Sequence, residues 1–355
     1  MNQQQASSTG ILLVNLGSPD SYQVPDVKRY LNEFLMDERV IDFPKWARKL
    51  LIEGIILRTR PPKSAAAYKK IWWEEGSPLI VISKRLTEKV RSRTQHPVAL
   101  GMRYGNPSIE AGIRDLLQQS PQLKKVMLVP LYPHYAMSSY ETVVVKAEEV
   151  LKISFPELEM DVLPPFFDDE RYISLLTDSI KPYVADEETH LMFSYHGVPE
   201  RHIKKGDTTK THCLKVADCC HQPCEAAQSV CYRHQVVRTS ELVAEKMGLE
   251  KEQFTVSFQS RLGPDPWLKP YTAKTLEEYP EHGVKKLAVA CPAFVADCLE
   301  TIEEIGMEGK EEFIEAGGEE FIMIPCLNDA DEWAELLTAY SHERINAEPE
   351  HVSST

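Results

Sequence analysis

The chain has 355 residues, of which 43% are hydrophobic and 26% are charged, the composition of a globular protein long enough for two domains. Its net charge of −14 argues against binding to nucleic-acid phosphates, because such binding needs clustered Lys and Arg. We therefore expect a globular protein without a nucleic-acid partner.

Residues 1–10 are polar and lack the charged start and the apolar run of a secretory signal. We expect a cytoplasmic protein in which residues 1–9 form a disordered tail. The apolar cluster at residues 50–57 is too short to cross a bilayer of roughly 30 Å. This cluster predicts at most a peripheral membrane contact, or a shield over a site.

Eight short apolar runs predict strands, and the stretches between them mostly show the period of amphipathic helices. The runs lie at residues 11–15, 98–101, 126–131, 160–163, 191–195, 254–258, 287–291 and 321–324. Alternation of this kind is typical of an α/β protein with doubly wound parallel sheets.

The two halves of the sequence resemble each other at three places, in the same order. Leu16 pairs with His196, residues 103–105 pair with residues 261–263, and residues 132–142 pair with residues 291–301. Strand-to-helix turns also share Gly and Pro by chance, so coincidence is the alternative.

The repeat predicts two similar Rossmann-like lobes at residues 10–180 and 181–330, each with a four-stranded parallel sheet. A C-terminal helix and tail should follow at residues 331–355. The ligand should lie in the cleft between the lobes, because ligands of open α/β sheets bind at the carboxyl ends of the strands.

His196 follows a predicted buried strand and begins a turn at its carboxyl end. A histidine in such a turn can serve as a general base or a metal ligand with a pKa near neutrality. The common alternative is a core histidine bonded to a backbone carbonyl.

Three acidic residues follow the seventh predicted strand. If residues 292–304 form an α-helix, Asp297, Glu300 and Glu304 lie on one face. Carboxylates in a line repel one another unless a cation or protons occupy the space between them. The alternative is a solvated acidic face near a helix N-terminus. Together with His196, the first interpretation predicts a site that takes protons from a substrate while handling a divalent metal.

Four motifs resemble those of ferrochelatases, in order and in spacing. They are LVNLGSP at residues 13–19, SYHGVP at 194–199, FQSRLGPDPWL at 258–268 and FVADCLET at 294–301. The resemblance implies a cleft between two Rossmann-like lobes in which Fe²⁺ is inserted into protoporphyrin IX, the terminal metal step of haem biosynthesis.

The resemblance also implies residue roles. His196 should act as proton acceptor or metal ligand with Glu300 beside it, and Glu304 and Asp297 should continue a polar path for protons or iron. Leu16 should press on the opposite face of the macrocycle. The other matching positions are Arg60, Tyr68 and Ser77 for the propionates, and Arg103, Tyr104 and Trp267 in the cleft wall.

Rival functions remain open at this point. Within the same fold, the chain could use coproporphyrin III or insert cobalt, although the apolar residues 50–57 favour the less polar porphyrin. A non-catalytic carrier of tetrapyrroles or of an iron–sulfur cluster is the rival from another class. The presence of both His196 and Glu300 argues against a carrier.

Five of the eight cysteines lie between residues 213 and 231. In a reducing compartment, clustered thiols are more often metal ligands than disulfides. Some bacterial ferrochelatases resemble this chain in carrying an internal cysteine set, which places an insertion at residues 207–235. The resemblance favours a [2Fe–2S] cluster over structural zinc. The expected ligands are Cys213, Cys220, Cys224 and Cys231, with Cys219 as a substitute.

Overall fold

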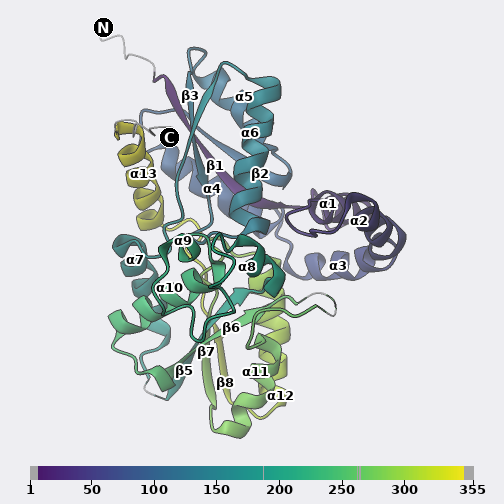
Figure 1. The fold of residues 1–355 in the computed structure, drawn as a ribbon, viewed down its shortest axis with the longest axis vertical. Helices are drawn as coiled ribbons and strands as arrows, with labels where there is room; N and C mark the ends of the chain where they lie inside the picture. The colour runs from purple at the N-terminus through teal and green to yellow at the C-terminus, as the bar shows by residue number, and fades with distance from the viewer. Residues whose placement is uncertain (1–6, 187, 262, 264, 348–355) are drawn as a thin grey trace.

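The computed structural model describes residues 7–186, 188–261, 263 and 265–347 (Figure 1). Each of the eight predicted runs overlaps a strand. The strands are β1 (Thr9–Ser18), β2 (Val98–Gly105), β3 (Lys125–Pro130), β4 (Glu159–Val162), β5 (Thr189–His196), β6 (Phe254–Gln259), β7 (Lys286–Ala290) and β8 (Glu320–Met323). Most of the predicted tails, residues 1–6 and 348–355, lie outside the described residues.

The strands form two parallel sheets with the same order, β2-β1-β3-β4 and β6-β5-β7-β8. Strand β1 therefore corresponds to β5, which confirms the fold class and the repeat. Each sheet consists of near-continuous apolar runs because helices cover both of its faces. The carboxyl ends of both sheets point toward the middle of the molecule (Figure 1).

The first sheet packs between two helical layers. Alternate residues of β1 enter opposite cores: Ile11 and Leu13 face one side, and Leu12 and Val14 face the other. The covering helices are α4 (Pro78–Arg91) on one side, and α5 (Ile109–Gln119) and α6 (Thr142–Ser154) on the other. A short π-helix at Met137–Glu141 leads into α6.

The second sheet is covered in the same way. One face packs on α10 (Tyr232–Met247), and the other packs on α11 (Thr272–Glu278), α12 (Lys310–Glu315) and a π-helix at Glu300–Gly309. The short helices α8 (Glu200–Gly206) and α9 (Glu225–Gln228) belong to the segment that contains the cysteines. Short 3-10 turns lie at Lys181–Tyr183, Lys251–Gln253 and Tyr279–His282.

Two helices join the lobes. Helix α7 (Glu170–Ile180), placed by the sequence in the first lobe, packs on α10 of the second lobe. Helix α13 (Asp331–Asn346) returns to pack on α4 and α7. One hydrophobic core therefore runs through both lobes, from Ile11 to Trp333. The predicted lobe boundaries at residues 180 and 330 remain a prediction.

A helical projection leaves the first lobe between β1 and α4, on the right in Figure 1. It contains α1 (Val24–Leu35), α2 (Lys45–Leu51), a π-helix at Ile52–Ile56 and α3 (Leu57–Ile71). Lys70 of α3 binds Glu303 over 2.7 Å, which ties this projection to the second lobe. Within the described residues, no helix combines the length and the apolar character that crossing a membrane requires.

Candidate functional site

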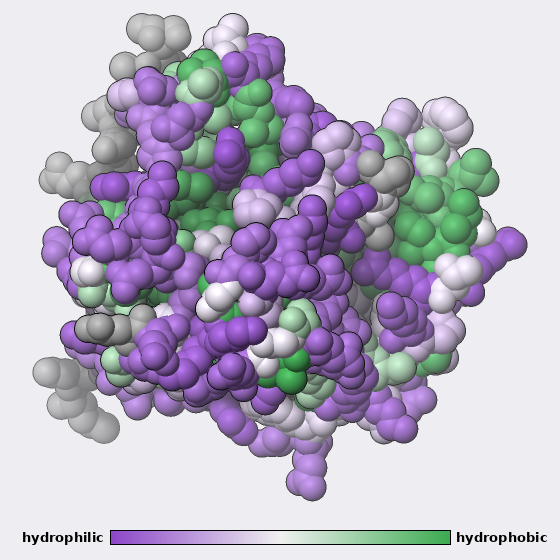
Figure 2. Space-filling model, turned by 90° about the horizontal axis from the view of Figure 1, so that it is seen from below, coloured by the Kyte–Doolittle hydropathy of each residue, from purple (hydrophilic) through white to green (hydrophobic). Residues whose placement is uncertain are grey.

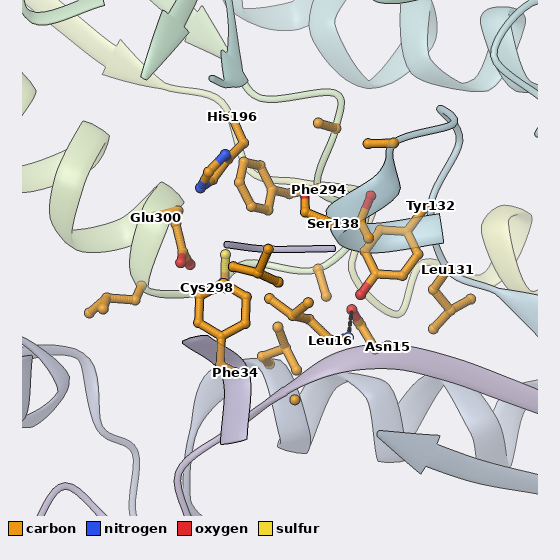
Figure 3. Close-up of a pocket in the computed structure, with 18 of the residues that line it drawn as sticks. Asn15, Leu16, Phe34, Leu131, Tyr132, Ser138, His196, Phe294, Cys298 and Glu300 are labelled. Carbon is orange, nitrogen blue, oxygen red and sulfur yellow. Dashed lines mark hydrogen bonds between the residues drawn. The ribbon is translucent and has the colours of Figure 1, made fainter. Parts of the chain in front are cut away.

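A cleft lies where the carboxyl ends of the two sheets face each other. It encloses about 1130 Å³ including its open mouth, and both lobes line it. Leu16, from the end of β1, and His196, the last residue of β5, project into it from opposite walls (Figure 3). The two residues that the repeat paired are therefore brought together at one site.

The ring of His196 is oriented by a backbone contact. Its Nδ1 lies 2.7 Å from the carbonyl oxygen of Gly197. A carbonyl can only accept, so Nδ1 carries the proton and Nε2 keeps a free lone pair. The ring extends toward Glu300 (Figure 3). Both alternatives considered for His196 are thus present, because one nitrogen is bonded to a carbonyl and the other has no hydrogen-bond partner among the described residues.

A glycine is needed directly after this histidine. A Cβ on Gly197 would lie 2.8 Å from the carbonyl oxygen of Gln259 and 3.2 Å from the indole of Trp267. The close approach lets the Gly197 N–H donate to the Gln259 carbonyl over 2.8 Å. Any larger side chain would push the turn away from β6.

Glu300 is the first residue of the π-helix Glu300–Gly309. The α-helix expected over residues 292–304 is therefore wrong: a non-helical segment precedes Leu299, and the wider π-turn sets the spacing after it. Glu300 still reaches the cleft beside His196 (Figure 3). Short π-helical segments are frequent at functional sites, where they reorient one side chain.

Glu304 lies behind Glu300 and outside the cleft lining. Its carboxylate accepts hydrogen bonds from the Ser260 N–H over 2.7 Å and from the Ser260 hydroxyl over 2.5 Å. Burial raises the pKa of Glu304, the bonds from Ser260 oppose the shift, and nearby Glu300 adds to it. A carboxyl with a raised pKa exchanges a proton more readily near neutrality.

Asp297 does not continue the line of acids. It precedes the π-helix and accepts hydrogen bonds from Asn328 over 2.7 Å and from the Thr301 hydroxyl over 3.0 Å. Its backbone N–H binds the Asn328 side chain as well. The expected alignment of Asp297 with Glu300 and Glu304 is wrong because the chain turns before residue 300. Asp297 holds that turn together.

Cys298 is buried in the cleft wall beside Glu300 (Figure 3). Burial, followed by the charge of Glu300, raises the pKa of the Cys298 thiol well above its ordinary range. The thiol is therefore neutral, and it adds no third negative charge next to Glu300.

The residues expected to bind the substrate divide into two groups. Tyr68, Ser77 and Trp267 are buried and line the cleft. Arg60 lies outside the lining, exposed on α3 two turns before Tyr68. Among the described residues it forms no ion pair, so its guanidinium is available to an anion.

Arg103 and Tyr104 are not in the cleft lining, contrary to expectation. Asp37 holds both, accepting a bond from the Arg103 guanidinium and one from the Tyr104 hydroxyl over 3.0 Å. The guanidinium also stacks 4.2 Å above the Tyr104 ring centroid. These contacts leave the pair behind the wall, where they support it.

Sequence reasoning missed several polar residues of the wall, among them Tyr132 and His134. The Tyr132 hydroxyl and the His134 Nδ1 are buried in the lining without a hydrogen-bond partner among the described residues, as is the Trp267 Nε1. Burial lowers the pKa of His134 to about 3, so its ring is neutral. The repeat could have indicated both, because residues 132–135 match residues 291–294 of the second lobe.

The cysteine-rich segment folds beside α10. Cys213, Cys219, Cys220 and Cys231 are buried, and burial raises the pKa of Cys220 to about 12. Cys219 and Cys231 add to the raised pKa of both Cys213 and Cys220. Cys224 is only partly buried. Within the described residues, no group of three or more His, Cys, Asp or Glu side chains is arranged to hold a metal ion.

The family model described as Ferrochelatase matches residues 8–345. Curated ferrochelatases are similar over 328 residues, or 92% of this chain. The one from Ectopseudomonas mendocina is 51% identical with 95% of its length covered, and the one from Azotobacter vinelandii is 50% identical with 96% covered.

A solved structure has the same fold. "SirB from Bacillus subtilis with Fe3+" superposes with a TM-score of 0.52 at 12% identity, covering 96% of this chain and 94% of that one. At this identity the similarity concerns the fold alone. It agrees with two chelatase-like lobes around a cleft.

Proposed function

The chain belongs to the ferrochelatase family, and from this premise we propose that Fe²⁺ is inserted into protoporphyrin IX in the cleft between Leu16 and His196. The enzyme is a lyase of haem biosynthesis. One observation carries the placement of the reaction: the free Nε2 of His196 and the carboxylate of Glu300 face the cleft from one side, and Leu16 faces it from the other (Figure 3).

The reaction needs proton acceptors. Protoporphyrin carries two pyrrole N–H groups, and both protons leave as Fe²⁺ binds the four nitrogens. His196 Nε2 is suited to take one proton, because Nδ1 is already committed to the Gly197 carbonyl. Glu300 takes the second proton or guides the cation. Two proton acceptors are useful because a single base would have to release the first pyrrole proton before it could accept the second.

Glu304 provides the next position for a proton. Gln259 ties Glu304 to the backbone of Glu300, since its side-chain amide donates to the Glu300 backbone carbonyl over 2.8 Å and to the Glu304 carboxylate over 3.4 Å. The raised pKa of Glu304 suits a group that receives a proton and passes it to solvent. Asp297 serves this path indirectly, by holding the turn before Glu300.

Leu16 and the unpaired polar groups fix the porphyrin. An apolar side chain pressing on one face favours exposure of the nitrogen lone pairs on the other, toward His196. Arg60, exposed on α3, is available for a propionate, because Arg and carboxylate form charge-assisted hydrogen bonds. Tyr68, Ser77 and the Trp267 N–H offer further polar contacts from the wall.

Anaerobic insertion assays test these assignments. Wild-type protein should turn over protoporphyrin IX with Fe²⁺ faster than coproporphyrin III or Co²⁺. His196→Ala and Glu300→Gln should each lose at least about 100-fold in kcat, the usual contribution of a general base. His282→Ala is the matched control, because His282 is an exposed histidine on the far end of the second lobe. Full activity in both site variants would refute the assigned roles.

We propose further that the clustered thiols bind a [2Fe–2S] cluster, with Cys213, Cys219, Cys220 and Cys231 as ligands. Thiolates are the ligands of such clusters, and these four thiols are buried within one segment, although the described side chains are not arranged to hold a metal ion. The Cys219 sulfur accepts N–H groups from Leu214 at 3.3 Å and Arg233 at 3.8 Å. Hydrogen bonds to sulfur tune such clusters. In this proposal Cys219 replaces Cys224 of the ligand set expected from the sequence. Structural zinc is the alternative to the iron–sulfur cluster.

Metal analysis of freshly purified protein tests the cluster. We expect iron and acid-labile sulfide in equal amounts and a visible absorption spectrum, all lost in Cys219→Ser and retained in Cys224→Ser. One zinc per chain without sulfide would replace the cluster with a structural zinc site. Loss in Cys224→Ser with retention in Cys219→Ser would restore the set expected from the sequence.

A peripheral membrane contact is proposed for the helical projection. Phe43, Trp46, Leu50 and Ile55 are exposed there, Trp46 by 74%, and Figure 2 shows the apolar patch they help to form. Exposed patches of this kind mark interaction surfaces. The proposed location is the cytoplasmic face of a membrane, where the eight free cysteines stay reduced.

Vesicle binding tests the membrane contact. Trp46→Ser should weaken sedimentation with phosphatidylglycerol vesicles several-fold. Ile153→Ser on α6 is the matched control, because this side chain is also exposed, by 80%, and lies on another helix. Equal binding by both variants would exclude the projection as the contact surface.

A further inference from the structure

The peptide group between His196 and Gly197 is held from both sides. Its carbonyl accepts the Tyr232 hydroxyl over 2.9 Å, and its N–H donates to the Gln259 carbonyl over 2.8 Å. The next carbonyl along the chain, that of Gly197, anchors the His196 ring. A rotation of this peptide would therefore turn the ring away from its place in the cleft.

Tyr232 is suited to this contact. Its side chain is 6% exposed and lies in the cleft wall, edge-on to the ring of His134. Burial raises the pKa of the Tyr232 hydroxyl, so the group stays a donor. A bond from a buried hydroxyl to a backbone carbonyl leaves few alternatives for either partner, since losing it would leave a buried acceptor unpaired.

Helix α10, which begins with Tyr232, forms hydrogen bonds with both lobes. Tyr232, Gln235, Thr239 and Ser240 lie on one face of α10, three, seven and eight residues apart from the first. Toward the first lobe, Gln235 accepts the Tyr135 N–H over 2.7 Å, and the Thr239 hydroxyl lies 2.9 Å from His134 Nε2.

Toward the second lobe, the Ser240 hydroxyl lies 2.8 Å from the Tyr195 hydroxyl, one residue before His196. The first half of α10 thus fixes the two cleft walls to each other. Tyr232 is the member of this face that contacts the catalytic turn itself.

Helix α10 begins directly after a clustered thiol. Cys231 is the N-cap residue, and Tyr232 is the first residue of the helix. A displacement of Cys231 moves the backbone of Tyr232, and with it the hydroxyl that holds the His196 carbonyl. Tyr232, which directly follows Cys231, is therefore also the residue that holds the backbone of His196, the proposed proton acceptor.

We infer that Tyr232 is a positioning residue that fixes the orientation of His196. Through it, a displacement of Cys231 changes the orientation of His196 in the cleft. The inference rests on the proposed role of His196 as proton acceptor. Tyr232 acts through the backbone and takes no proton from the substrate.

Tyr232→Phe tests the positioning role, because it removes only the hydroxyl. We expect kcat to fall roughly fivefold to tenfold, the loss that one hydrogen bond accounts for, with KM for protoporphyrin within a factor of two of wild type. In protein labelled at the histidine rings, the His196 resonance, assigned through His196→Ala, should move. Tyr140→Phe is the matched control, since its hydroxyl also donates to a backbone carbonyl, that of Leu163, over 2.8 Å.

Wild-type kcat and an unmoved His196 resonance in Tyr232→Phe, with His196→Ala inactive, would overturn the inference and leave the proposed function intact. An active His196→Ala would instead remove the proposed role of the histidine. A fall in thermal stability of Tyr232→Phe equal to that of Tyr140→Phe, with the resonance moved only in Tyr232→Phe, separates positioning from general stability.

The link to the thiol is tested by Cys231→Ser against Cys224→Ser in the same labelled spectrum. We expect the His196 resonance to move in Cys231→Ser and to stay in place in Cys224→Ser. An unmoved resonance in Cys231→Ser would overturn the transmission from the thiol, even if Tyr232→Phe behaves as expected.

Discussion

Ser260 binds Glu304 with both of its donors, its N–H at 2.7 Å and its hydroxyl at 2.5 Å, while its backbone adopts a left-handed φ of 64°. A left-handed φ is unfavourable for any residue with a Cβ. The strained backbone aims both groups at one carboxylate, directly after β6. Glu304, which is outside the cleft lining, is therefore fixed in place by two hydrogen bonds.

Replacing Ser260 separates the hydroxyl from the backbone strain. Ser260→Ala and Ser260→Gly both remove the hydroxyl, so we expect a similar fall in kcat, roughly threefold to tenfold, if Glu304 relays protons. The glycine variant should be more stable than the alanine variant by about 1 kcal/mol, because glycine adopts a positive φ without penalty. Chemical denaturation and anaerobic turnover measure the two effects. Unequal kcat values would mean that strain, and not the hydroxyl, matters for catalysis.

The pKa of Glu304 predicts how stability depends on pH. Burial raises this pKa above its ordinary value of 4.5, so the folded state holds the proton more tightly than the unfolded state. The carboxyl therefore contributes stability below pH 4.5 that is lost as the pH rises through the folded pKa. Glu304→Gln, which stays neutral, should unfold at a higher temperature than wild type at pH 8.

The advantage of Glu304→Gln should shrink at pH 4, where the wild-type carboxyl is mostly protonated in both states. Thermal melts at the two pH values give the comparison, with Glu308→Gln on the exposed side of the same helix as the control. A variant that is less stable than wild type at pH 8 would mean that the hydrogen bonds from Ser260 to the charged carboxylate outweigh the cost of burying it.

Much of this site could be predicted from the sequence because its parts depend on short-range signals. The strands follow from apolar runs, and the pairing of Leu16 with His196 follows from two similar turns. The π-helix after Leu299 has no distinct period that a search for α-helical spacing detects, so the position of Asp297 was misjudged. The contact of Tyr232 with His196 joins a helix to a turn 36 residues away, and no local pattern records such a bond.

The same reason explains the misplacement of Arg103, whose partner Asp37 lies 66 residues earlier. The two side chains are 12% and 5% exposed. Asp37→Ala would leave the guanidinium buried without its partner, so we expect a loss of about 3–5 kcal/mol in unfolding free energy. Asp20→Ala, which removes an exposed partner of Arg29, should cost under about 1 kcal/mol. Urea denaturation of both variants decides whether the pair is structural.

The Asp37 pair should also respond to acid. Burial opposes ionisation of Asp37, but bonds from Thr142, Arg39 and Arg103 outweigh it and lower the pKa below its ordinary 3.8. The stability from this carboxylate is present above pH 3.8 and is lost as the pH falls through the folded pKa. The deficit of Asp37→Asn relative to wild type should shrink between pH 5 and pH 3. A constant deficit would show that the charge of Asp37 is not its source.

Gly17, which follows Leu16 in β1, permits the closest backbone approach in the cleft wall. A Cβ at this position would lie 1.8 Å from the Tyr104 carbonyl oxygen, and φ is 109°. Gly283 also has a positive φ, 88°, but a Cβ there would meet nothing within 4 Å. Gly283→Ala should therefore cost only about 1–2 kcal/mol from the backbone conformation.

Gly17→Ala adds the clash, which neither strand can relieve without breaking the pairing of β1 with β2, and should cost more than about 4 kcal/mol. Unfolding free energies of the two variants measure the difference. If Gly17→Ala is no less stable than Gly283→Ala, β1 can shift at Leu16, and the leucine is not held rigidly against the porphyrin.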